Sequence, residues 1–86
     1  IADGLLTSLG HRNFTLIQRY VDDIITVDED NIRDAMYLIW SRLKQIVEPS
    51  GAVSYAALLD RGCKFKDKTV VAVLSGGNVD LAALPW

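Results

Sequence analysis

The sequence contains few of the residues from which many functional sites are built. It has one histidine, one cysteine and two prolines, and its net charge is −2. One histidine and one cysteine cannot complete the four-ligand shell of a structural zinc ion, and a single cysteine cannot form an internal disulfide. His11 and Cys63 lie far apart in the sequence and are interpreted as incidental. We therefore predict neither a metal site nor a nucleophilic triad.

Charge and hydropathy exclude further classes of protein. A net charge this small gives no support for a nucleic-acid partner or an anionic membrane surface. No apolar run approaches the roughly 20 residues of a membrane span, and the opening residues 1–4 lack the basic region of a signal peptide. A single cysteine favours a reducing compartment. We expect a cytoplasmic protein without nucleic-acid or membrane partners.

Apolar residues are abundant for so short a chain. They make up 50% of the 86 residues, although a small domain has much surface and little core. The chain does not begin with methionine, and apolar side chains interrupt its opening loop. We expect residues 1–86 to be the C-terminal segment of a longer protein and not a complete domain.

The order of sequence patterns predicts helices that alternate with strands. Apolar residues at helical spacing indicate helices over residues 13–20, 28–47 and 50–59. The β-branched runs at 24–27 and 69–74 are typical of buried strands, and a hydrophobic link into the next helix is the alternative for 24–27. This order predicts parallel α/β packing, and two strands alone do not make a stable sheet, so further strands are expected outside these residues.

Proline and glycine set the predicted helix boundaries. Pro49 is expected to end the long helix and to begin the next one, with Glu48 extended between them. Small residues at Gly51, Ala52 and Ala56 permit a close approach to a neighbouring element, and Gly62 is the expected helix stop.

Two positions are candidates for a ligand site. The run 69–74 ends in Ser75, Gly76 and Gly77, and ligands of open α/β sheets bind outside the carboxyl ends of strands. Glu48 lies at the predicted break between two helices. Neither pattern is specific alone, and the local pattern at Ser75 favours a tight turn with a capping serine.

Four sequence blocks together are more informative. In order along the chain they are Ile1-Ala-Asp-Gly4, Val21-Asp-Asp-Ile24, Val47-Glu-Pro-Ser-Gly-Ala52 and Leu74-Ser-Gly-Gly-Asn-Val-Asp-Leu81. With them the chain resembles the C-terminal part of the pyridoxal-phosphate enzymes that include threonine and serine dehydratases, serine racemase and hydroxyaspartate dehydratases. The resemblance implies an α/β fold of the tryptophan-synthase-β-like kind (fold type II), with residues 1–86 in the large domain.

The resemblance also implies roles for individual residues. Ser75 would hydrogen-bond the pyridine nitrogen of pyridoxal 5′-phosphate, where a neutral hydroxyl moderates the electron sink and favours elimination over transamination. Gly4 and Glu48 would lie near the ring, Asp3 would orient the loop around Gly4, and Gly76 would be among the cofactor-binding residues.

The resemblance also concerns a possible regulatory site. In the racemase branch, residues matching Lys44 and Asn78 help to form a nucleotide effector site. The Schiff-base lysine, the phosphate loop and the divalent-cation site of the family lie upstream, and no lysine of this chain has the catalytic context. No catalytic residue is therefore assigned, and the 86 residues alone are expected to be inactive.

The resemblance implies a lyase that eliminates water and ammonia from a small β-hydroxy amino acid (serine, threonine or hydroxyaspartate) to give an oxo acid. Serine racemase is the alternative within the family, and a non-catalytic α/β fragment or assembly module is the alternative outside it. The missing N-terminal part of the same protein is the expected partner, and family analogy implies a homodimer.

Overall fold

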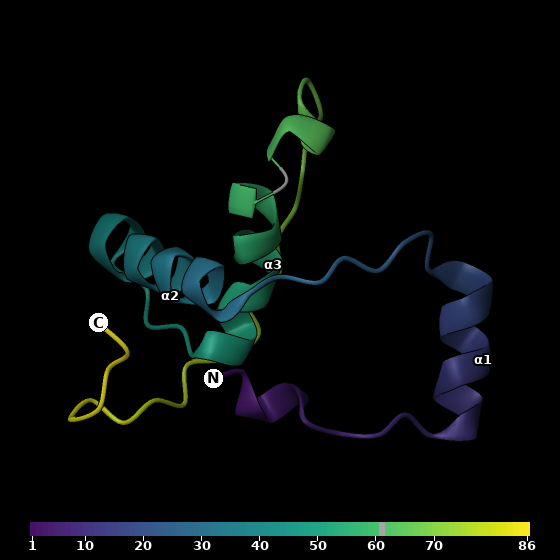
Figure 1. Ribbon diagram of the computed structural model, residues 1–86, viewed down its shortest axis with the longest axis horizontal. Coiled ribbons are helices and arrows are strands. Elements are labelled where there is room, and N and C mark those ends of the chain that lie inside the picture. The colour runs from purple at the N-terminus through teal and green to yellow at the C-terminus, as the bar shows by residue number, and fades with distance from the viewer. Residues whose placement is uncertain (61) are drawn as a thin grey trace.

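The computed structural model describes residues 1–60 and 62–86, without the side chains of residues 60, 62 and 63. Its elements are a 3-10 turn (Asp3–Leu5), α1 (His11–Tyr20), α2 (Glu29–Leu38), a π-helical turn (Ile39–Leu43), α3 (Pro49–Asp60) and a second 3-10 turn (Gly62–Phe65). Helices α2 and α3 pack together, whereas α1 stands apart at the end of two long loops (Figure 1). Cys63, interpreted from sequence as incidental, lies outside the side chains described.

Helix α2 begins where the sequence predicts. The Asp28 carboxylate accepts a hydrogen bond from the Asn31 N–H at 2.8 Å and caps the helix, and two acidic residues occupy the first turn, where the helix dipole favours negative charge. One face of α2 packs on α3, where Ala52 and Ala56 are fully buried because their small side chains let the helices approach closely. The buried core consists of Ile32, Ala35, Met36, Ile39, Val47, Ala52 and Ala56.

The long helix ends earlier than predicted. After the π-helical turn, Lys44 adopts a left-handed conformation with φ of 57°, which stops the helix well before Pro49. Leu43 and Ile46 consequently leave the core and are each 60% exposed. The apolar pattern that predicted the helix continues to Val47, because Val47 is buried in the core although it lies in the segment between the helices. Pro49 is the first residue of α3, as predicted.

The other helix boundaries match the sequence within a few residues. Helix α1 begins at His11, two residues before the predicted start, with Gly10 as its N-cap. It ends at Tyr20, where the Val21 N–H donates to the Ile17 carbonyl at 2.9 Å. Helix α3 ends at Asp60, and the predicted stop at Gly62 involves residue 61, which lies outside the described residues.

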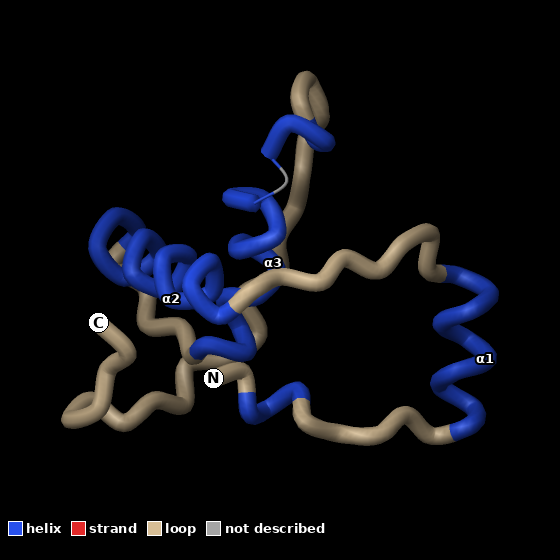
Figure 2. Tube along the Cα trace, viewed as in Figure 1, coloured by secondary structure: helices blue, strands red, loops and turns tan. Residues whose placement is uncertain are grey.

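The two predicted strands are absent from the described part of the chain. Residues 24–27 and 69–74 are loop segments (Figure 2). They are also more exposed than predicted, with Ile24 at 72% and Val71 at 87%. A strand requires a hydrogen-bonded neighbour, and these two segments do not pair with each other. The prediction of strands was wrong for the described part of this chain, since the pattern anticipated neighbours that residues 1–60 and 62–86 do not supply.

The C-terminal tail is irregular and folds back onto α2. Asp80 closes a turn in which its carboxylate accepts from the Ala82 N–H at 2.9 Å. The Trp86 ring then lies edge-on to Tyr37 and Trp40, with centroid separations of 5.6 and 5.4 Å. None of the helices in residues 1–60 and 62–86 combines the length and hydropathy that a membrane span requires.

Candidate functional site

The N-terminal end of α3 holds the segment that carries the Gly-Gly turn. The backbone N–H of Glu48, just before the helix, donates to the Gly76 carbonyl at 2.9 Å. Two turns further on, the Ser54 hydroxyl donates to the Val73 carbonyl at 2.8 Å. These two bonds flank Ser75, so the backbone is held on one side of it by Glu48 and on the other by Ser54 of α3.

The same end of α3 also holds the opening loop of the chain. The Gly4 N–H donates to Ser50 Oγ at 3.1 Å and to the Asp3 carboxylate at 2.9 Å. The Asp3 carboxylate therefore helps to hold the loop at Gly4. Since Ser50 and Ser54 are four residues apart, they lie on one face of α3 and together attach two segments that are distant in sequence.

Close backbone packing explains the glycines of this region. A Cβ atom at Gly51 would lie 2.9 Å from the Gly76 carbonyl oxygen, and one at Gly77 would lie 2.8 Å from the Ile46 carbonyl oxygen. A Cβ atom at Gly76 would collide with the Glu48 carboxylate. Gly76 and Gly77 do not have positive φ values, so the turn requires glycine for its missing side chain rather than for its conformational freedom.

Four of the predicted site residues gather around this helix end. Gly4, Glu48 and Gly76 are joined to it by the contacts above, and Ser75 is held next to Gly76. The Ser75 side chain is exposed, and its hydroxyl has no hydrogen bond within the described residues. The arrangement thus presents one uncommitted hydroxyl on a backbone fixed on both sides.

The two predicted effector residues are placed differently. Lys44 ends the π-helical turn, and its ammonium donates to the Ser41 carbonyl at 2.6 Å. Asn78 lines a cavity of about 160 Å³ between the C-terminal tail and the start of α3. Lys44 is not among the residues that line this cavity, so the structure does not bring the two together there.

Sequence reasoning missed Ser50 and Ser54. Both follow Pro49 closely, and serine is common near the start of helices. Their presence therefore gave no reason to expect contacts with other segments. The available signal was the spacing of the two serines. Residues four apart lie on one face of a helix, and Gly51 beside them leaves room for another segment to approach.

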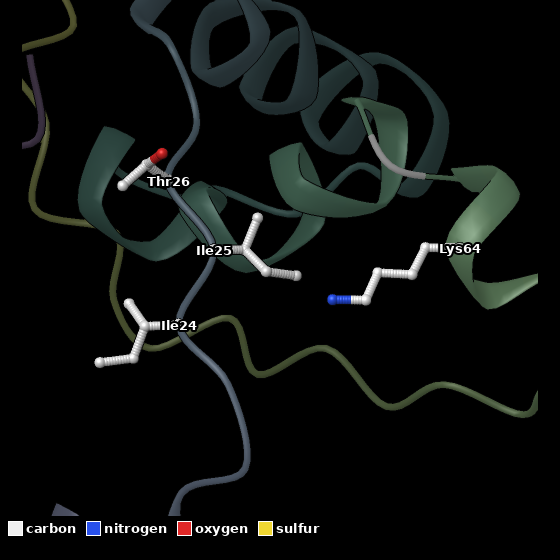
Figure 3. A pocket seen from close by; sticks show the side chains of 4 residues that line it. All are labelled: Ile24, Ile25, Thr26 and Lys64. Atoms are coloured by element: carbon white, nitrogen blue, oxygen red, sulfur yellow. The ribbon is translucent and has the colours of Figure 1, made fainter.

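A second cavity lies away from this helix end. It has a volume of about 250 Å³ and is lined by Ile24, Ile25, Thr26 and Lys64, with the Lys64 side chain reaching toward Ile25 (Figure 3). The Lys64 ammonium donates to Asp23 Oδ2 at 2.6 Å and lowers the pKa of that carboxyl group. None of the predicted cofactor residues lines this cavity. No group of three metal-ligating side chains occurs among the described residues.

Comparison with known proteins identifies the family. A family model described as "Pyridoxal-phosphate dependent enzyme" matches residues 1–76. Serine racemase from Dictyostelium discoideum is 48% identical, over 98% of this chain and 26% of its own length. The beta-hydroxyaspartate dehydratase of Paracoccus denitrificans (strain Pd 1222) is 42% identical, over 100% of this chain and 27% of its own.

Solved structures agree with the sequence relatives. The T.th. threonine deaminase superposes with a TM-score of 0.85 at 44% identity, covering 92% of this chain and 29% of that one. Maize serine racemase superposes with a TM-score of 0.87 at 41% identity, covering 95% and 27% of the two chains. The chain thus spans about a quarter of the length of these relatives. The expected fold class, a piece of an α/β fold type II enzyme, is confirmed.

Enzymes of this family use pyridoxal phosphate. The residues present fit one side of such a group, because the exposed Ser75 hydroxyl is uncommitted within the described residues and its backbone is fixed by Glu48 and Ser54. Side-chain-free glycines at positions 4 and 76 adjoin the same helix end. With a match over residues 1–76 and relatives above 40% identity, the chain belongs to the family of pyridoxal-phosphate dependent enzymes.

Proposed function

We propose that the full-length protein containing these residues is a pyridoxal-phosphate-dependent lyase. Its reaction removes water and ammonia from a small β-hydroxy amino acid and yields an oxo acid. The observation that carries the proposal is Ser75, a neutral hydroxyl presented on a fixed backbone at the position that the family resemblance assigns to the pyridine nitrogen. The beta-hydroxyaspartate dehydratase and threonine deaminase among the relatives support it.

The chemistry of a serine at this position favours elimination. When bound, pyridoxal phosphate supplies the electron sink for charge at the substrate α-carbon. A hydroxyl, which is neutral at pH 7, does not keep a neighbouring ring nitrogen protonated as an ionised aspartate does. Ser75 therefore makes the cofactor a weaker electron acceptor than an aspartate would, which favours loss of a β-hydroxyl group.

Glu48, Gly4 and Gly76 have supporting roles in the proposal. Gly4 and Gly76 have no side chain and so let the loop and the turn lie close against Ser50 and Glu48, and Asp3 keeps Gly4 in place. The Glu48 carboxylate lies against Gly76, where it limits the movement of the turn that carries Ser75.

Serine racemase is the second candidate function. Serine racemases from several organisms match essentially the whole chain at 42 to 48% identity. A nucleotide effector site that uses Lys44 and Asn78 belongs to this candidate. Binding of ATP that is weakened by Lys44→Ala, and not by Lys66→Ala, would support it.

The proposal extends to the location and assembly of the whole enzyme. We propose a cytoplasmic homodimer in which residues 1–86 pack on the upstream part of their own chain. That part would supply the Schiff-base lysine and the phosphate loop.

One incubation separates the two candidate functions. The full-length protein is loaded with pyridoxal phosphate and given serine, threonine or 3-hydroxyaspartate, and the oxo acid, the ammonia and the substrate enantiomers are quantified together. A lyase gives oxo acid and ammonia in equal amounts, whereas a racemase gives mainly the opposite enantiomer. Absence of both products with every substrate would contradict the proposed function.

Ser75→Ala tests the residue that carries the proposal. Loss of one hydrogen bond is worth on the order of 1 kcal/mol, so about a three- to tenfold loss of cofactor affinity is expected, with a shift in the cofactor absorption spectrum. Ser8→Ala is the matched control, because Ser8 is exposed and makes no hydrogen bond within the described residues. An unchanged affinity and spectrum in Ser75→Ala would count against the role of Ser75.

A further inference from the structure

One peptide group joins the core of the structure to the Gly-Gly turn. The indole Nε1–H of Trp40 donates to the Val47 carbonyl oxygen at 2.8 Å. The Glu48 N–H, which belongs to the same peptide bond as that carbonyl, donates to the Gly76 carbonyl oxygen at 2.9 Å. The two bonds form a chain from the Trp40 ring through a single planar peptide to Gly76.

The partly buried surroundings of this peptide strengthen both hydrogen bonds. The Val47 side chain is 1% exposed, so the peptide starts in the core, and the Trp40 ring is partly buried against that core. Hydrogen bonds that are linked in a chain polarise one another, and they gain strength away from water. The edge-on contact with Trp86 restricts the tilt of the Trp40 ring.

We propose that Trp40 is a positioning residue for the cofactor site. Through the Val47–Glu48 peptide it sets the orientation of the Glu48 N–H, which fixes Gly76 and with it the adjacent Ser75. Trp40 does not contact the cofactor in this proposal and acts on it only through this relay of hydrogen bonds. The part of the inference that concerns the cofactor depends on the proposed function, whereas the link between Trp40 and Gly76 does not.

The physical reason lies in the planarity of the peptide. Without the indole donor, the Val47 carbonyl is left with an unmet hydrogen bond in a partly buried place, and the peptide turns toward another donor. The Val47 C=O and the Glu48 N–H point in opposite directions within one rigid plane. Rotation of that peptide therefore misaligns the bond from the N–H to Gly76. Ser54 still holds Val73, so the loss is concentrated at Gly76 and Ser75.

The test compares Trp40→Phe with Trp86→Phe in the full-length protein. Both variants remove the same atoms from one aromatic cluster, but the Trp86 indole makes no hydrogen bond within the described residues. The first measurement is hydrogen exchange of the Glu48 amide in the cofactor-free protein. The second is the rate at which pyridoxal phosphate dissociates from the loaded protein.

We expect faster exchange of the Glu48 amide in Trp40→Phe, by about three- to tenfold for the loss of one hydrogen bond, and no such change in Trp86→Phe. The cofactor should leave Trp40→Phe faster by a similar factor. Equal exchange in the two variants would overturn the relay, and faster exchange with unchanged cofactor dissociation would overturn its role at the cofactor site.

Two further controls keep these outcomes distinct. If the loaded protein gains no cofactor mass after borohydride reduction, the proposed function fails, while the exchange measurement still decides whether Trp40 holds the peptide. If Trp40→Phe does not fold, benzothienylalanine at position 40 keeps the bicyclic shape and removes only the N–H. Wild-type exchange of the Glu48 amide in that protein would overturn the inference.

Discussion

Gly51 and Gly76 approach so closely that a methyl group at position 51 would lie 2.9 Å from the Gly76 carbonyl oxygen and 3.2 Å from its nitrogen. The contact joins the first turn of α3 to the turn that follows residues 69–74. Both of the facing atoms at Gly76 are backbone atoms, so they cannot rotate away as a side chain would. The close approach therefore fixes the distance between the helix and the backbone next to Ser75.

The first prediction concerns Gly51→Ala. Alanine inside a helix ordinarily gains about 0.5–1 kcal/mol over glycine, but here the added methyl group must displace Gly76. We expect Gly51→Ala to lower the melting temperature of the full-length protein and to accelerate cofactor release. Gly10→Ala is the control, because nothing lies within 4 Å of a Cβ atom there. Equal stability and cofactor retention in the two variants would contradict the close packing.

The second prediction separates the two serines of α3. Ser54→Ala removes the side-chain donor to the Val73 carbonyl, at an expected cost of about 1 kcal/mol in the free energy of unfolding. Ser50→Ala should cost less, because the Gly4 N–H keeps its bond to Asp3. Denaturant titration of the full-length protein measures both, with Ser8→Ala as the reference. A larger effect of Ser50→Ala would show that Asp3 does not hold Gly4.

The third prediction is a pH dependence. The hydrogen bond from Lys64, helped by the Ile24 N–H and the charge of Lys64, lowers the pKa of Asp23 below its usual value of 3.8. A carboxyl group with a lowered folded-state pKa binds fewer protons in the folded state than in the unfolded one. Its contribution to stability is therefore complete above pH 3.8 and is lost as the pH falls through the lowered value.

Carbon-13 shifts of the labelled carboxyl groups measure this effect. Asp23 should titrate at lower pH in the wild-type protein than in Lys64→Ala, whereas Lys66→Ala should leave its titration unchanged. An identical titration of Asp23 in all three proteins would mean that the pair does not form in solution.

The fourth prediction concerns the isolated 86 residues. Large apolar side chains such as Leu6 and Val71 are 84% and 87% exposed, and the apolar faces of α1 and of residues 69–74 have no cover within the described residues. We expect this piece to be poorly soluble or oligomeric, because contiguous exposed apolar surface promotes association. Size-exclusion chromatography and thermal unfolding decide the point, and a monomer that unfolds cooperatively would contradict it.

Local signals allowed much of the helical structure to be predicted from sequence. The Asp28 cap, the start of α3 at Pro49 and the fully buried Ala52 and Ala56 each follow from chemistry within one or two turns. The end of the long helix did not follow, because the left-handed conformation of Lys44 has no marker such as glycine in the sequence.

Features that depend on distant contacts were predicted less well. The strands expected at 24–27 and 69–74 need neighbours that the described part of the chain does not provide. For the site, the family motifs singled out Ser75, Gly76 and Glu48, but the serines of α3 and the Trp40 bond to Val47 depend on which segments pack together. Sequence spacing alone does not specify such contacts.

The most direct test of the proposed function is the intact mass of the full-length protein, loaded with pyridoxal phosphate, before and after borohydride reduction. Reduction fixes a cofactor that is held as a Schiff base on a lysine. We predict a gain of one cofactor mass per chain, on a lysine outside these 86 residues. A folded full-length protein that gains no mass would contradict the claim that Ser75 and its neighbours form one side of a cofactor site.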